Sequence, residues 1–180
     1  MDPFELMGLP RRPLLSEDEI GSAYRRLAAS LHPDHAEGDA SRFKELGEAS
    51  AILRDPARRL RALVGSLPAS SIPPEAEQLF SGVASLLRES DELLARHAAA
   101  TNPLTKAVLA GPLKNLGQKL DSKMAELEGW RSRLEDRLSA LDAAWPSADP
   151  LEIASLADSL AYAPRWKDQL RERKLTLECL

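Results

Sequence analysis

The sequence contains only one cysteine, Cys179, among its 180 residues. A single thiol cannot form an internal disulfide, and it excludes a zinc or iron-sulfur site built from several cysteines. No apolar run approaches the roughly 20 residues that a membrane-spanning helix needs. The first ten residues lack the basic and apolar regions of a secretory signal and the Arg/Ser-rich character of a transit peptide. We therefore expect a cytoplasmic protein that does not act in a membrane.

Aromatic residues are also scarce, at 4% of the chain. Leu, Ala, Glu, Lys and Arg recur instead, and these residues favour helices over strands. The net charge is -4 and the sequence pI is about 5.5, without the basic stripe that binding to phosphate backbones requires. The composition predicts an all-α protein that does not bind nucleic acid.

Helix boundaries are marked by short polar motifs. An Asp or Asn followed by Pro supplies a capping oxygen and then a residue whose missing N–H costs nothing in the first helical turn. Four such pairs occur, and they are Asp2-Pro3, Asp55-Pro56, Asn102-Pro103 and Asp149-Pro150. Glu follows three residues after Asp2, Ser16 and Asp149, as in a capping box. Gly8 and Gly65 are predicted to end helices.

Two helices in the N-terminal third are predicted to form an antiparallel hairpin. The first spans about 17–31, where Ile20, Tyr24, Leu27 and Leu31 form one apolar stripe. The second spans about 40–54 and carries the same period. The segment 32–39 between them is too rich in Pro, Asp and Gly to be helical.

The remainder of the chain is predicted to form a three-helix bundle. Residues 66–74 are rich in Pro and Ser and separate a unit at 1–65 from a unit at 75–180. The expected helices span about 75–97, 113–145 and 150–177, with a kink at Pro164. A short helical piece at 103–110 is expected to stop at Gly111-Pro112. Short connections make this an up-down-up bundle.

The most informative motif is His32-Pro33-Asp34, at the tip of the predicted hairpin. Proline disfavours a helical conformation at the preceding residue, so the helix ends and the tripeptide is presented in the loop. A short capped helix, a basic-edged helix, this tripeptide and an antiparallel helix together resemble a J domain. The resemblance implies that a DnaK/HscA-type chaperone ATPase is the partner, and that the tripeptide binds it together with Tyr24, Arg25 and Arg26.

Within the J-domain proteins, the chain is most similar to the HscB (Jac-type) co-chaperones of iron-sulfur cluster assembly. The similarity rests on Phe4, Leu6, Gly8, Leu9 and Pro10. It continues at Ala49, Leu53, Pro56, Arg59 and Leu63. It implies that the C-terminal bundle binds a client, an IscU-type scaffold protein. The client-binding residues that it implies are Leu86, Leu87, Glu89 and Tyr162, although Gly82 and Ser85 stand where that family has large apolar residues.

Other interpretations of these residues remain open. The tripeptide could be an ordinary connection between helices, and the chain could be a J-domain protein with a different client, a complex-anchoring protein or a helical adaptor. His32 and His35 have the spacing of a metal-binding pair, but no nearby residues complete a ligand set. No nucleophile and base, metal site or cofactor motif can be assembled. We therefore expect a regulatory protein, not an enzyme, with no cofactor.

Overall fold

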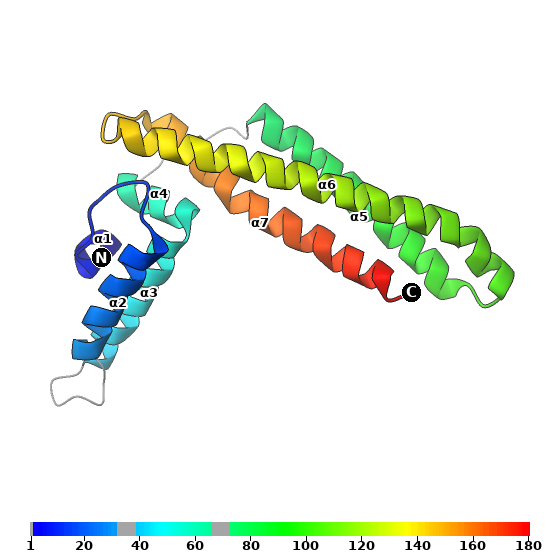
Figure 1. The fold of residues 1–180 in the computed structure, drawn as a ribbon, viewed down its shortest axis with the longest axis horizontal. Coiled ribbons are helices and arrows are strands. Elements are labelled where there is room, and N and C mark those ends of the chain that lie inside the picture. The colour runs from blue at the N-terminus through cyan, green and yellow to red at the C-terminus, as the bar shows by residue number, and fades with distance from the viewer. Residues whose placement is uncertain (1, 32–38, 66–72) are drawn as a thin grey trace. The chain divides into compact units, whose positions relative to one another are not determined.

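The computed structural model describes residues 2–31, 39–65 and 73–180, and every regular element in these ranges is a helix (Figure 1). The helices are α1 (Pro3–Met7), α2 (Glu17–Leu31), α3 (Ala40–Arg54), α4 (Pro56–Val64), α5 (Pro74–Ala99), α6 (Pro103–Ala144) and α7 (Pro150–Glu178). The predicted all-α class is confirmed. Helices α2 and α3 begin and end at the residues that the sequence pattern predicted.

The predicted helix starts are confirmed by their hydrogen bonds. The Asp2 carboxylate accepts the Phe4 N–H at 3.0 Å, and the Asp55 carboxylate accepts the Ala57 N–H at 2.9 Å. Asn102 and Asp149 accept backbone N–H groups at the starts of α6 and α7 in the same way. These side chains satisfy donors that have no partner inside the helix.

The start of α2 is capped reciprocally. The Ser16 N–H donates to the Glu19 carboxylate at 2.7 Å, and the Glu19 N–H donates to the Ser16 hydroxyl at 3.1 Å. At the C-terminal end of α1, Gly8 ends the helix with φ +62°, a left-handed conformation that glycine adopts without steric cost. The local sequence therefore determines where these helices begin and end.

Helices α1, α2, α3 and α4 pack around a small apolar core, and α2 and α3 form the predicted hairpin. Its fully buried large side chains are Phe4, Met7, Ile20, Leu46, Leu53 and Leu60. These residues come from all four helices, so the capped elements are held together by shared burial of apolar surface.

Helix α6 does not stop at Gly111-Pro112, so the predicted break there is wrong. The helix continues for 42 residues from Pro103 to Ala144. Pro112 removes one hydrogen-bond donor, to the carbonyl of Val108, and both residues are exposed. Water can therefore solvate that carbonyl, and good helix formers on both sides carry the helix through. Helix α7 likewise continues through the exposed Pro164.

Ion pairs define the register of the bundle helices α5, α6 and α7. They are Glu75–Arg133 and Glu89–Lys119 between α5 and α6, Glu128–Lys167 and Asp121–Lys174 between α6 and α7, and Asp91–Arg173 between α5 and α7. In the α5–α6 and α6–α7 pairings, residue numbers rise along one helix as they fall along the other, so each of these two helix pairs is antiparallel. The helices therefore run up, down and up, as predicted.

The chain divides into two compact units. One comprises Met1–Ser71 and Leu134–Leu160, and the other comprises Ile72–Arg133 and Ala161–Leu180. Within the first unit, the Leu14 N–H donates to the Asp142 carboxylate at 2.9 Å and Arg61 pairs with Asp158 at 2.6 Å. The predicted boundaries at 1–65, 66–74 and 75–180 stay a prediction.

Candidate functional site

The end of the α2–α3 hairpin is closed by a backbone hydrogen bond. The Asp39 N–H donates to the Leu31 carbonyl at 3.3 Å. The Asp39 carboxylate also caps α3 by accepting the N–H groups of Ser41 at 2.9 Å and Arg42 at 3.1 Å. The last residue of α2, Leu31, is therefore hydrogen-bonded to the residue that precedes α3, Asp39.

The predicted tripeptide, His32, Pro33 and Asp34, lies outside the described residues, as does His35. Its place in the chain is nevertheless informative, because it begins directly after Leu31, the last residue of α2. The hydrogen bond from Asp39 to Leu31 joins the two described residues that stand before and after residues 32–38.

The other three predicted chaperone-binding residues lie on α2. Arg25 and Arg26 are exposed and Tyr24 is half-buried. The Arg25 guanidinium donates to the Ser22 hydroxyl at 3.2 Å. The Arg26 guanidinium lies on another side, 4.0 Å from where a β-carbon on Gly8 would stand. The structure thus offers two accessible cations that point toward different neighbours.

Arg59 is a buried cation whose role the sequence pattern did not reveal. It is 3% exposed, and its guanidinium donates to the backbone carbonyls of Pro13 at 2.7 Å and Leu53 at 2.5 Å. Burial lowers the pKa of Arg59, and the carboxylates of Asp55 and Asp142 oppose that shift. Arg59 is among the residues that resemble the HscB family, but the sequence did not predict that its side chain is buried.

The predicted client-binding residues do not form one surface. Leu86 is buried at 6% exposure, and Glu89 is half-buried and pairs with Lys119 at 2.6 Å. Both line a cavity of about 380 Å³ between α5 and α6, together with Gly82 and Ser85. The α5 side of this cavity is thus lined by Gly82, Ser85 and Glu89 together with one large apolar side chain, that of Leu86.

Tyr162 belongs to a different feature, an aromatic cluster between α5, α6 and α7. Its ring stacks on Trp166 with centroids 5.6 Å apart, and Trp130 also stacks on Trp166 at 5.6 Å. Phe80 contacts Trp166 at 5.9 Å and is 55% exposed. Leu87 is half-buried on α5, seven residues after Phe80 and therefore on the same side of that helix.

The residues that the structure describes contain no group of three or more His, Cys, Asp or Glu side chains arranged to hold a metal ion. None of the helices within the described ranges has the length and apolar character to cross a membrane.

The N-terminal third of the chain is similar to known proteins. Residues 2–61 match the DnaJ domain family. Similar relatives include the chaperone protein DnaJ of Deinococcus proteolyticus, 48% identical over 61 residues, and that of Hyphomonas neptunium, 46% identical over 61 residues. The chaperone protein DnaJ 2 of Nocardia farcinica is 55% identical over 47 residues.

These alignments cover only part of each protein. They include 32%, 32% and 24% of this chain and 19%, 15% and 12% of the respective relatives. The matched chain therefore spans less than a fifth of those curated relatives. No solved structure matched the chain. The matched region contains α1, α2, α3 and the start of α4, together with the tripeptide. Residues 2–61 of this chain are a DnaJ domain.

Proposed function

We propose that this protein is a co-chaperone that stimulates ATP hydrolysis by a DnaK-type chaperone. The observation that carries the proposal is the DnaJ domain at 2–61 with His32-Pro33-Asp34 at the junction of α2 and α3. The proposed mechanism is regulatory. The DnaJ domain binds the hydrolysis-competent state of the chaperone more tightly than its other states, and this difference in affinity shifts the chaperone toward hydrolysis.

The tripeptide is tested by His32→Gln in the full chain. We expect this change to abolish stimulation of a purified DnaK-type ATPase while the far-ultraviolet circular dichroism stays the same. His97→Gln, the same substitution on α5, is the matched control and should stimulate normally. Undiminished stimulation by His32→Gln would refute the proposal.

We further propose that Arg25 and Arg26 steer the DnaJ domain toward acidic groups on the chaperone. Both are exposed, and neither forms an ion pair with a described residue. Reversing both charges to Glu should slow association and reduce its dependence on salt, because the long-range attraction is lost. Lys44→Glu, on the exposed side of α3, is the control. Equal salt dependence of the two variants would contradict the assignment.

For the client, we propose an IscU-type iron-sulfur scaffold protein bound by the helical bundle at 75–180. The proposal rests on the similarity to HscB-type proteins and on Tyr162, which stacks on Trp166, the residue that the exposed ring of Phe80 also contacts. Exposed aromatic side chains are common binding anchors. Leu87 lies on the same side of α5 as Phe80, whereas Leu86 and Glu89 line the cavity between α5 and α6.

Titration calorimetry of the full chain with a purified scaffold protein tests this assignment. Tyr162→Ala should weaken binding, whereas Leu151→Ala, at an exposed leucine elsewhere on α7, should not. Gly82 and Ser85, which stand where the HscB family has large apolar residues, favour a second candidate, a DnaJ-domain protein with another client or an anchoring role. Absence of scaffold binding together with intact ATPase stimulation would select that candidate.

A further inference from the structure

Helix α2 contains a buried glycine, Gly21, in its interior. Glycine inside a helix costs stability relative to alanine, so its presence there calls for a reason in the packing. A β-carbon on Gly21 would stand 3.2 Å from the Nη1 atom of Arg25 and 3.9 Å from the Nη2 atom of Arg54. The missing side chain therefore leaves room for two guanidinium groups, one from α2 and one from α3, beside the same point.

Each of these guanidinium groups is held by a neighbour on one edge. The Nη2 atom of Arg25 donates to the Ser22 hydroxyl at 3.2 Å, and the Nε atom of Arg54 pairs with the Glu17 carboxylate at 2.8 Å. The other nitrogens, Nη1 of Arg25 and Nη2 of Arg54, are the ones that lie at the Gly21 position. Both arginines are exposed, so a partner protein can reach the two groups together.

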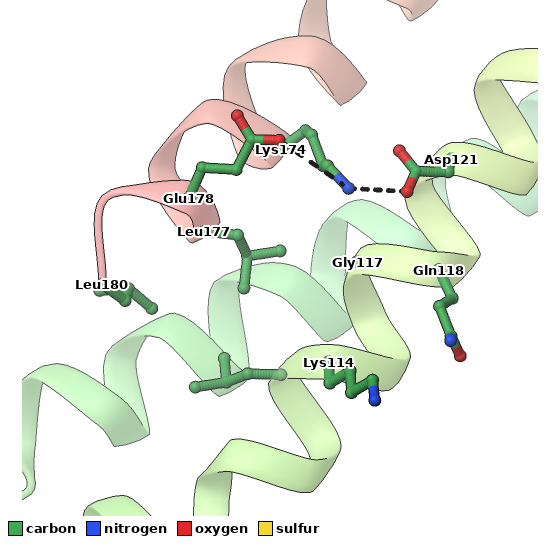
Figure 2. Close-up of a pocket in the computed structure, with 9 residues that line it drawn as sticks. Lys114, Gly117, Gln118, Asp121, Lys174, Leu177, Glu178 and Leu180 are labelled. Carbon is green, nitrogen blue, oxygen red and sulfur yellow. Dashed lines mark hydrogen bonds and ion pairs between the residues drawn. The ribbon is translucent and has the colours of Figure 1, made fainter.

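The charges of this arginine pair, Arg25 and Arg54, are only partly neutralised. Among the described residues, Arg25 forms no ion pair, so the two cations share one paired carboxylate. The cavity between α6 and α7 shows the reverse arrangement (Figure 2). There one cation, Lys174, pairs with Asp121 at 2.7 Å and with Glu178 at 4.0 Å. The arginine pair, unlike that lysine, retains donor groups for a further acid.

We propose that Arg54 acts together with Arg25 to bind one acidic side chain of the DnaK-type chaperone. This inference rests on the proposed function, and it adds a residue of α3 to the contact made by α2. A guanidinium donates pairs of N–H bonds that fit the two oxygens of a carboxylate, and such charge-assisted bonds are stronger than neutral ones. The ion pair with Glu17 holds Arg54 in the orientation that this contact needs.

A carboxylate suits this site better than a phosphate. Asp18 is exposed one helical turn before Gly21, and Glu17 lies beside it. These two acids repel a doubly charged phosphate about twice as strongly as a singly charged carboxylate. The arginine pair therefore selects its ligand through hydrogen-bond geometry at short range. We expect it to slow dissociation of the chaperone more than it speeds association.

The test measures ATP hydrolysis by a purified DnaK-type chaperone while the concentration of the full chain is varied. Arg54→Gln should raise the concentration that gives half-maximal stimulation about tenfold, because charge-assisted hydrogen bonds to the chaperone are lost. The maximal stimulation should stay the same, since the tripeptide is intact. Arg58→Gln, which removes the same charge from an exposed site on α4, is the matched control. Equal half-maximal concentrations for the two variants would overturn the proposal.

Two further variants distinguish a shared carboxylate from general attraction. Arg54→Lys keeps the charge but lacks the planar fork, so it should weaken the contact nearly as much as Arg54→Gln. Undiminished affinity of the lysine variant would contradict the proposed geometry. Arg25→Gln with Arg54→Gln should weaken binding by less than the product of the two single effects, because both arginines bind one group. Effects that simply multiply would show two independent contacts and would also overturn the proposal. Thermal unfolding checks that each variant is folded.

The same titrations separate failure of this inference from failure of the proposed function. If the unchanged chain does not stimulate the ATPase at any concentration, the proposed function is wrong and so is the inference that rests on it. If the chain stimulates but Arg54→Gln behaves like Arg58→Gln, only the role of the arginine pair is wrong. His32→Gln should abolish the maximal stimulation, whereas the Arg54 variants should change only its dependence on concentration.

Discussion

Arg59 offers the sharpest test of how the first compact unit is held together. Its guanidinium is 3% exposed and satisfies two carbonyls, those of Pro13 in the α1–α2 connection and Leu53 near the end of α3. Replacing it by Met keeps most of the volume and removes both donors. Two acceptors are then buried without partners.

The expected cost follows from those two carbonyls. Leaving a buried polar group without its hydrogen bond costs about 1–3 kcal/mol, so Arg59→Met, which leaves two such groups, should lower the free energy of unfolding by about 2–6 kcal/mol. Arg59→Lys should recover part of the loss, because an ammonium lacks the planar fork that reaches both oxygens. A loss of this size is a large fraction of the roughly 5–15 kcal/mol that stabilises a typical domain.

Urea unfolding of the full chain, followed by far-ultraviolet circular dichroism, measures these differences. Arg58→Ala, one residue away on α4 and exposed, is the control and should change stability by less than about 0.5 kcal/mol. If Arg59→Met matched Arg58→Ala, the two hydrogen bonds would contribute nothing and the reasoning would be refuted.

Three further predictions concern single residues. Hydrogen bonds from the Ser16 backbone and hydroxyl hold the pKa of Glu19 below its usual 4.5, so its stabilising contribution is present above that pH and is lost as the pH falls below it. Glu19→Gln should therefore flatten the acid side of the stability profile, measured by urea midpoints; an unchanged profile would contradict this. Asp39→Ala should cost about 1 kcal/mol in urea unfolding by uncapping α3, and Asp39→Asn should retain most of the cap. Pro112→Ala should raise the thermal midpoint by restoring a donor to the Val108 carbonyl, and a lower midpoint would show that proline is required there.

The helices of the DnaJ domain were predictable because their signals are local. Asp2, Ser16 and Asp55 cap the following turn through hydrogen bonds that span only two or three residues. The break predicted at Gly111-Pro112 is wrong because the local sequence alone does not decide whether a helix ends at a proline. A local rule assigns the proline a cost, but whether a helix tolerates that cost depends on exposure and on the residues at either side.

The binding surfaces show the same division. The absence of Asp and Glu from residues 93–120 can be read directly from the sequence. Which basic residue of this stretch forms an ion pair depends instead on the fold, which places Glu89 of α5 beside Lys119 of α6. The predicted client set mixed residues from two sides of α5. Leu86 and Leu87 are adjacent in sequence, but a helix turns about 100° per residue, so one is buried and the other is half-exposed.

The all-α class, the α2–α3 hairpin and the DnaJ domain with its tripeptide follow from local signals, because capping, periodicity and motif spacing act over a few residues. Three features became visible only in the folded protein: the burial of Arg59, the stacking of Tyr162 on Trp166, and the continuation of α6 through Pro112. Each of these depends on neighbours far away in the chain or on exposure to solvent. Such neighbours are set by packing, which no local pattern records.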